Sequence, residues 1–197
     1  MTPKQQRGEA TVDRLLTAAL EVYATSGQSG FTVNAVTTAS GVSLGSLYHH
    51  FGSFDGLAAA LYIRCMEQLF DEMIAALGRT RTARTGVRAL VRAYLRFTQE
   101  HPDAALFVHA SAYSGYLSAH ADRIRTAKAA KMTVVAEWML PRVLSGEMAP
   151  LPGPLLEVLV MGPIAEAAHR WLASTYDMDL AEAERILPDR IWRSLQP

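Results

Sequence analysis

The amino-acid sequence predicts an all-α protein of about nine helices. Apolar residues recur at the helical period along most of the 197 residues, and no segment shows the alternation that is typical of a strand. Half of the residues are hydrophobic and 19% are charged, so the chain can form a sizeable core. We expect an N-terminal three-helix domain, residues 1–56, followed by a larger helical domain, residues 57–197.

The first three predicted helices follow one another closely. The first covers residues 12–25 and ends at the run SGQSG. Thr32 is the expected N-cap of a short second helix, because its hydroxyl can accept a hydrogen bond from the first turn. Gly41 then provides a turn, and Ser43 is the expected cap of the helix LGSLYHHF. Two short helices joined by a glycine turn predict a helix-turn-helix motif, whose second helix can enter the major groove of DNA.

The larger domain is also predicted to consist of helices. Ser53 is the expected cap of a long helix that ends near Leu77, and the basic run GRTRTARTG is expected to connect it to the next helix. Later helices are expected at residues 87–100, 102–118, 120–144, 155–176 and 180–195. Gly162 and Pro163 should bend or open their helix, because proline lacks the backbone N–H.

Charge and cysteine content narrow the class of protein. Lys plus Arg and Asp plus Glu balance at 19 each, so the overall positive field of many nucleic-acid binders is absent. Cys65 is the single cysteine, which excludes an internal disulfide and fits a reducing compartment. The N-terminal run is polar, and the most apolar window contains two Glu and a Pro. We therefore expect a soluble, cytoplasmic protein.

The sequence predicts neither a catalytic site nor a metal site. The sequence contains no H-E-x-x-H, no phosphate-binding loop and no C-x-x-C pair, so we expect neither an enzyme nor a cofactor. His49 and His50 are adjacent, and adjacent side chains diverge by about 100° on a helix, whereas metal-binding histidine pairs usually lie at i and i+4. We therefore expect no metal site, and a contact to a base or a phosphate by at least one of these histidines.

A longer motif surrounds these residues. Phe31-Thr32-Val33 is followed by the run ASGVSLGSLYHHFGS, residues 39–53, which contains the pattern G-V-S-x-G-S-L-Y-x-x-F. This segment resembles the DNA-binding domain of the TetR family of transcriptional regulators, and the close match covers about residues 12–62. The rest of the chain fits the family in helix number and order. The resemblance implies a homodimer that binds a palindromic DNA operator and releases it when a small molecule enters the C-terminal domain.

Several residues of the motif are candidate DNA contacts. Gly45 has no side chain, so the start of the helix can approach base edges, and the apolar Leu44 would favour a thymine methyl group over guanine. Tyr48 should point outward from the buried Leu47, and the resemblance implies a phosphate contact. Simple capping by Thr32 and Ser43, a solvated Asn34 and a surface-packed Tyr48 are the alternatives. The predicted DNA contacts are Thr32, Asn34, Ser43, Leu44, Gly45, Ser46, Tyr48, His49 and His50.

The motif departs from the family in its charge. Many members place Lys or Arg at the position of Leu44 and Lys at the position of Phe54, and no Lys or Arg lies between Arg14 and Arg64 here. Neutral groups, together with Lys4, Arg7 and Arg14, would have to position the protein on DNA. Because counterion release scales with the number of neutralised phosphates, we expect a shallow salt dependence of operator binding.

The larger domain contains aromatic and Met residues on several amphipathic helices. Such residues are core residues more often than ligand contacts, but a mainly apolar pocket would suit a hydrophobic or aromatic effector. The candidate ligand contacts are Tyr94, Phe97, Phe107, Tyr113, Trp138 and Met161.

The resemblance implies that the last two long helices pair with those of a second subunit. Some of their apolar residues would otherwise face the core of their own subunit. The candidate interface residues are Leu155, Leu159, Ile164, Ala168, Trp171, Ile191, Trp192 and Leu195.

These expectations together describe a sequence-specific DNA-binding transcriptional regulator. We expect a repressor that a small effector releases from a palindromic operator. The missing charge leaves one alternative, a ligand-binding helical dimer with weak or lost DNA binding.

Overall fold

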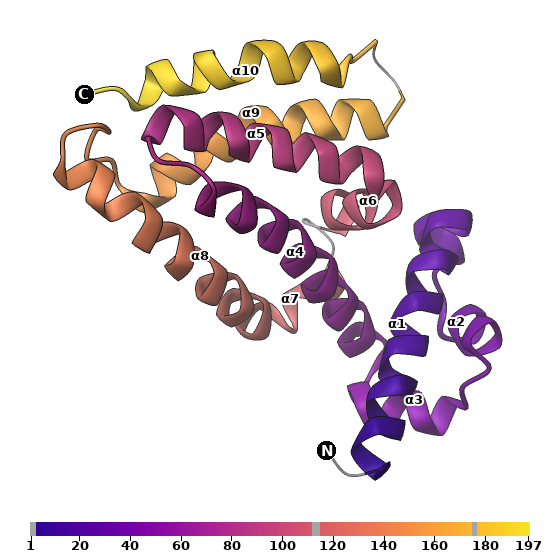
Figure 1. Ribbon diagram of the computed structural model, residues 1–197. Coiled ribbons are helices and arrows are strands. Elements are labelled where there is room, and N and C mark those ends of the chain that lie inside the picture. The colour runs from indigo at the N-terminus through magenta and orange to yellow at the C-terminus, as the bar shows by residue number, and fades with distance from the viewer. Residues whose placement is uncertain (1–2, 112–114, 175–176) are drawn as a thin grey trace. The chain divides into compact units, whose positions relative to one another are not determined.

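The computed structural model describes residues 3–111, 115–174 and 177–197, and within them it contains helices and no strand (Figure 1). Among the described residues, nine helices have eight or more residues and α7 has four, which confirms the predicted all-α fold. The elements are α1 (Pro3–Gly30), α2 (Val33–Ser40), α3 (Leu44–Phe51), α4 (Phe54–Gly78), α5 (Ala83–Glu100), α6 (Pro102–Ser111), α7 (Gly115–Ser118), α8 (Ala121–Leu144), α9 (Gly153–Leu172) and α10 (Leu180–Leu195).

The chain divides into two compact units. Unit one consists of Met1–Met66 and Asp103–Thr126, and unit two consists of Glu67–Pro102 and Ala127–Pro197. Both units contain part of α4, because this helix begins at Phe54 and ends at Gly78. The functional boundary between residues 56 and 57 stays a prediction.

The helices of unit one surround an apolar core. α1 packs against α2, and α2 against α3. Val36 and Leu47, from α2 and α3, are fully buried. The ring of Tyr23 lies edge-on to Phe31 and to Phe107, with centroid distances of 5.4 and 4.8 Å. Phe107, a candidate ligand contact, is therefore a core residue of unit one.

The predicted caps of the short helices are confirmed. The hydroxyl of Thr32 accepts from the N–H of Ala35 at 3.2 Å, and that of Ser43 accepts from the N–H of Ser46 at 3.2 Å. Ser53 caps α4 in the same way, with 2.9 Å to the N–H of Gly56. Each cap satisfies a backbone donor that the first turn of a helix leaves without an intrahelical partner.

Several boundaries differ from the prediction. α1 extends from Pro3 to Gly30 rather than over residues 12–25, and α9 begins at Gly153 rather than at residue 155. α5 begins at Ala83 rather than at residue 87, because Thr82 and Thr85 form a capping box within the basic run that was expected to be a connector. Within the predicted helix 102–118, α6 covers Pro102–Ser111 and α7 covers Gly115–Ser118, whereas residues 112–114 lie outside the described residues. α9 ends at Leu172 rather than at residue 176. α9 is assigned as helix through Pro163, while α10 has the predicted bounds.

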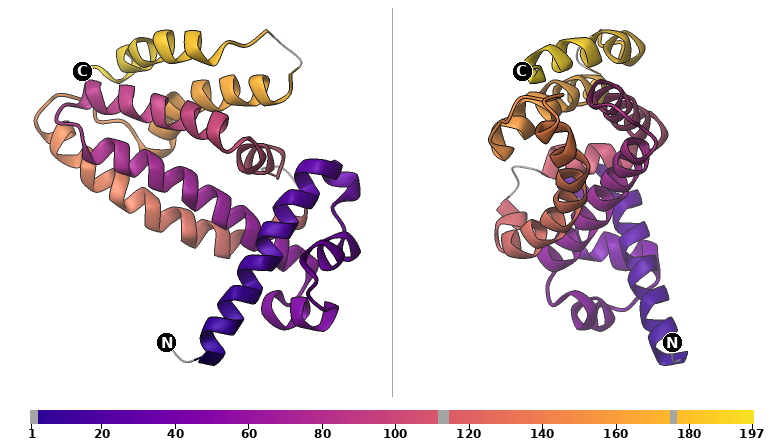
Figure 2. Two further views of the ribbon diagram at one scale, coloured as in Figure 1. Left: turned by 45° about the vertical axis from the view of Figure 1, so that its right-hand side comes forward. Right: turned by 60° about the vertical axis from the view of Figure 1, so that its left-hand side comes forward.

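Unit two is built on α5, α9 and α10, which pack together (Figure 1). Their buried side chains include Val91, Phe97 and Ile164. Along the outer side of α5 and α10, Arg84 lies 3.1 Å from Asp189, and Arg92 lies 2.6 Å from Glu184. α8 runs beside the second part of α4 (Figure 2), and an ion pair between Lys131 and Asp71 joins the two helices.

Within the described residues, no helix combines the length and the apolar composition needed to cross a bilayer.

Candidate nucleic-acid interface

The turn between α2 and α3 is closed by three adjacent residues. Gly41 has a φ of 63°, a left-handed conformation that glycine adopts without steric strain. The hydroxyl of Ser40 accepts from the N–H of Val42 at 3.2 Å and donates to the carbonyl oxygen of Thr37 at 3.3 Å. Val42 itself is buried. The turn therefore fixes the direction in which α3 leaves α2.

Arg14 of α1 supports this turn from outside the motif. Its Nη2 donates to the carbonyl oxygen of Ser40 at 2.6 Å. That carbonyl belongs to the last residue of α2, where helix carbonyls lack intrahelical partners and the helix dipole favours a cation. The guanidinium of Arg14 thus binds the end of α2, and the expected contact of Arg14 with a DNA phosphate stays a prediction.

The sequence around Arg14 gives little indication of this contact. The one local signal is weak: no Asp or Glu lies three or four residues from Arg14 on α1, so the charge has no partner on its own helix.

α3 presents one face to the core and one to solvent. Leu47 is fully buried, whereas Leu44 is 47% exposed and Tyr48 is 43% exposed. A Cβ added at Gly45 would meet no atom within 4 Å. Leu44, Gly45, Tyr48 and His49 form the exposed face of α3, as the sequence predicted, and Ser46 is half-buried at its margin.

The start of α2 lies open as well. Thr32 and Asn34 are exposed, and Thr32 uses its oxygen as the helix cap. The cap leaves the hydroxyl hydrogens of Thr32 and of Ser43 able to donate to an acceptor such as a phosphate. Capping and phosphate contact are therefore compatible at these two positions.

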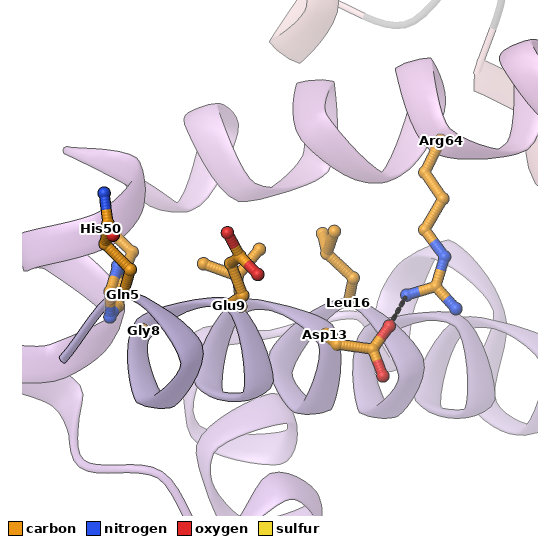
Figure 3. Close-up of a pocket in the computed structure, with 8 residues that line it drawn as sticks. Gln5, Gly8, Glu9, Asp13, Leu16, His50 and Arg64 are labelled. Carbon is orange, nitrogen blue, oxygen red and sulfur yellow. Dashed lines mark hydrogen bonds and ion pairs between the residues drawn. The ribbon is translucent and has the colours of Figure 1, made fainter. Parts of the chain in front are cut away.

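The two adjacent histidines occupy different environments. His49 is exposed, whereas His50 is half-buried in a shallow groove beside α1, where a methyl group at Gly8 would lie 3.8 Å from its Cε1 (Figure 3). Their rings are 5.1 Å apart. The predicted contact of His50 with DNA is therefore less direct than that of His49. Among the described residues there is no group of three or more His, Cys, Asp or Glu that could hold a metal ion.

The groove beside His50 is crossed by an ion pair. Arg64 of α4 lies 3.0 Å from Asp13 of α1 and also donates to Thr17 at 3.3 Å (Figure 3). The groove has a volume of about 450 Å³, and it is lined by Gln5, Gly8, Glu9, Val12, Asp13, Leu16, His50 and Arg64. Arg64 therefore joins α4 to α1 within unit one.

Phe54 occupies the position at which the resemblance led us to expect a Lys, and its packing explains the difference. Its ring packs on Phe31, with 4.9 Å between the centroids, and the residue is half-buried. A Lys in its place would lose this contact. The surface that α2 and α3 present thus lacks fixed positive charge, since the nearest arginines in sequence, Arg14 and Arg64, bind groups of their own unit.

Comparison with known proteins agrees with this geometry. Residues 15–61 match the family described as bacterial regulatory proteins, tetR family. The first three helices and the start of α4 thus match the DNA-binding domain of the tetR family. No curated protein sequence matches the chain significantly.

Solved structures share the fold over nearly the whole chain. A TetR family transcription regulator from Marinobacter aquaeolei VT8 is 22% identical, with a TM-score of 0.74 over 97% of this chain and 98% of that one. A putative tetR family regulator from Shewanella sp. PV-4 is 20% identical, with a TM-score of 0.77 over 94% and 97%. The regulator FadR from Bacillus subtilis, solved with stearoyl-CoA, is 18% identical, with a TM-score of 0.76 over 90% and 96%. The chain therefore combines a helix-turn-helix domain of the tetR type with the overall fold of these regulators.

One further pattern within this TetR-family motif needs a structural explanation. Gly41-Val42-Ser43-Leu44-Gly45 also fits G-x-S-x-G, the pattern of the serine-hydrolase nucleophile, which requires a turn from a strand into a helix. Ser43 instead follows α2, and its oxygen caps α3. Burial raises the pKa of the Cys65 thiol to about 11, so Cys65 is a poor nucleophile at neutral pH.

The candidate ligand contacts of the larger domain lie in different environments. Tyr94 and Phe97 on α5 are buried in unit two, and Met161 on α9 and Trp138 on α8 are half-buried there. Phe107 belongs to unit one, and Tyr113 lies outside the described residues. Within unit two, Trp138 and Met161 therefore retain surface that a ligand can contact.

The candidate dimer contacts fall into two groups. Ile164, Ala168, Ile191 and Leu195 are buried within unit two itself, because α5, α9 and α10 pack on one another. Leu155 is 47% exposed, and Leu159, Trp171 and Trp192 are half-buried. A second subunit would therefore contact the second group.

Proposed function

We propose that this TetR-family regulator is a homodimeric repressor that binds a palindromic operator and is released by a small apolar effector. The observation that supports DNA binding is the exposed face of α3, which consists of Leu44, Gly45, Tyr48 and His49. On the opposite face of the helix, Leu47 is buried in the core. We further propose that it acts in the cytoplasm, without a cofactor and without catalysing a reaction.

Recognition would depend on neutral groups. The open space at Gly45 allows the helix start to approach base edges, and Leu44 offers an apolar contact for a thymine methyl group. The hydroxyls of Thr32, Ser43 and Tyr48 would donate to phosphates, which fixes the register of the protein on the duplex.

Dimerisation would set the distance between the two α3 helices. Half-sites one helical turn apart require recognition helices separated by about 34–36 Å. The partly exposed residues Leu155, Leu159, Trp171 and Trp192 are the proposed contacts between subunits. An effector would release the operator only if it bound the DNA-incompetent arrangement more tightly.

Two observations support an apolar effector. Trp138 and Met161 are half-buried apolar residues within unit two. The similar protein FadR was solved in complex with stearoyl-CoA, so a protein of this fold can accommodate a long apolar chain.

The test is a mobility-shift assay with the DNA that flanks the gene, at low and moderate salt. We expect a specific shift by the wild type, a weaker shift by Tyr48→Phe, which lacks only the hydroxyl, and little shift by Tyr48→Ala. Tyr62→Phe, on α4, is the matched control and should behave as the wild type. No specific shift at low salt would refute the repressor proposal.

One observation favours a second candidate function. Because Arg14 and Arg64 bind groups of their own unit, the surface of α2 and α3 has little positive charge. The second candidate is therefore a ligand-binding helical dimer that binds DNA weakly or no longer binds it. The same assay separates the two candidates, since such a dimer would bind ligand without shifting any flanking DNA.

A further inference from the structure

α8 differs from the other long helices in its inner face. Its half-buried apolar residues are spaced three and four apart, so they share one side of the helix, yet none of the described residues of α8 is buried. On α5, by contrast, Val87, Val91 and Leu95 are buried. The inner apolar residues of α8 are Met132, Val135, Trp138, Met139 and Val143.

Polar contacts rather than a packed core hold α8 in unit two. Lys128 pairs with Glu157 of α9, and Lys131 pairs with Asp71 of α4. Ion pairs that keep solvent exposure contribute little to stability, typically about 0–1 kcal/mol. The inner face of α8 is therefore held by half-buried side chains and weak ion pairs rather than by fully buried residues.

Trp138 and Arg142 form a stacked pair at one end of this face. The indole of Trp138 lies over Gly86 of α5, where a Cβ would come within 2.1 Å of Cη2. The guanidinium carbon of Arg142 lies 3.7 Å above the indole ring. Nη1 of Arg142 donates to the carbonyl oxygen of Trp138, and Nη2 donates to those of Thr80 and Arg81 at 3.4 and 3.3 Å.

This pair contains two buried donors that lack an acceptor. Nε1 of Trp138 and Nε of Arg142 are the buried side-chain nitrogen or oxygen atoms without a hydrogen-bond partner among the described residues. Both atoms can only donate, so they cannot satisfy each other. A buried donor without an acceptor costs about 1–3 kcal/mol.

The carboxylate of Glu147 does not supply the acceptor. Glu147 follows the end of α8, and its Oε2 accepts from the N–H of Ala83 at 2.6 Å. In the part of the chain that the structure describes, no Asp or Glu forms an ion pair with Arg142. The pair thus combines a positive charge, two free N–H groups and an apolar ring.

From these contacts we infer that the inner face of α8 binds a small apolar molecule that ends in a carboxylate. The carboxylate oxygens accept hydrogen bonds from Nε1 of Trp138 and Nε of Arg142, because charge-assisted acceptors satisfy such donors best. The apolar body lies along Met132, Val135 and Met139. This inference deepens the proposed function, since it gives the chemical class of the effector and rests on the role proposed for unit two.

The test uses the purified full-length protein without DNA. Octanoate and 3-phenylpropionate are each compared with the matched alcohol and methyl ester, by calorimetric titration and by the shift in melting temperature. We expect both acids to bind at least about tenfold more tightly than their alcohols, the difference of one charge-assisted hydrogen bond. The affinities of the methyl esters should lie between those of the acids and the alcohols, because an ester carbonyl accepts a hydrogen bond but carries no negative charge.

Two conservative variants locate the binding site. Trp138→Phe keeps the ring and removes Nε1, and Arg142→Lys keeps the charge and removes Nε. Each should lower the affinity for the acids about tenfold and leave that for the alcohols unchanged. Arg185→Lys, on the exposed side of α10, is the matched control and should bind the acids as the wild type does.

Two results would overturn the inference: acids that bind no better than the alcohols, or folded Trp138→Phe and Arg142→Lys proteins that bind acids as the wild type does. Release of operator DNA is measured separately. Acids that bind at these residues but do not release the operator would confirm the binding site and count against the effector role in the proposed function.

Discussion

Unit one and unit two hold their helices by different means. In unit one, the short helices α2 and α3 are fixed by the buried side chains Val36 and Leu47, by two caps and by Arg14 at the turn. In unit two, the part of α8 that begins at Ala127 has no buried residue among those described. A surface that binds DNA in a single register benefits from rigid helices. A helix that lines a ligand site, by contrast, has to move when the ligand binds. The difference in packing thus matches the proposed division of roles.

The largest effect should come from the buried side of α3. Leu47→Ala removes a fully buried side chain and should lower the free energy of unfolding by about 3–5 kcal/mol, measured by urea denaturation. Leu44→Ala, on the exposed side of the same helix, should change it by about 0.5 kcal/mol or less and still weaken operator binding. Equal losses of stability for the two variants would contradict the assigned faces of α3.

Substitution of one glycine in each unit by Ala should have different effects on stability. Gly86→Ala should displace the indole of Trp138 and destabilise the protein by about 1–3 kcal/mol, visible as a lower melting temperature and altered tryptophan fluorescence. Gly45→Ala enters open space on α3 and should leave the melting temperature unchanged or slightly raised. Its operator affinity should nevertheless fall, because the added methyl group separates the helix from the bases. Normal operator binding by Gly45→Ala would show that α3 does not approach the bases closely.

A substitution of Arg14 distinguishes a role in holding the α2–α3 turn from a direct contact with a DNA phosphate. Because its guanidinium binds the carbonyl of Ser40, Arg14→Ala should lower affinity for the specific operator about tenfold, as the loss of a charged hydrogen bond would. Binding to unrelated DNA and the salt dependence should stay nearly constant. Arg7→Ala is the control on the exposed side of α1, and it should weaken both kinds of DNA binding and make the salt dependence shallower. An Arg14→Ala protein that behaves like Arg7→Ala would assign Arg14 to a phosphate.

The smallest effect concerns the outer ion pairs of unit two. The hydrogen bond from Arg84 lowers the pKa of Asp189 below its ordinary value, and Arg84, Arg88 and Arg193 lower it further. The pairing therefore stabilises the protein above the unfolded-state pKa, and this contribution is lost as the pH falls through the folded-state pKa. Melting temperature should decline slightly less between pH 6 and pH 3 for Asp189→Asn than for the wild type. An identical decline would show that Asp189 does not contribute.

Local sequence signals predicted part of this structure. The caps Thr32, Ser43 and Ser53, the turn at Gly41 and the bounds of α10 depend on residues within a few positions, so periodicity and capping rules were sufficient. The bond from Arg14 to Ser40 joins residues 26 positions apart, and that from Arg64 to Asp13 joins residues 51 apart. Such contacts depend on how the helices pack, as do the position of His50 beside α1 and the place of Phe107 in the core of unit one.

The central claim is that α3 binds its operator through a rigid surface with little fixed charge. The direct test is the slope of log K against log salt concentration for the wild-type dimer and its operator. Lys4 and Arg7 of two subunits would neutralise about four phosphates, which predicts a slope of about −4 or shallower at roughly −0.9 for each phosphate. A slope steeper than about −5 would contradict the claim, because other cations would then have to contact DNA phosphates.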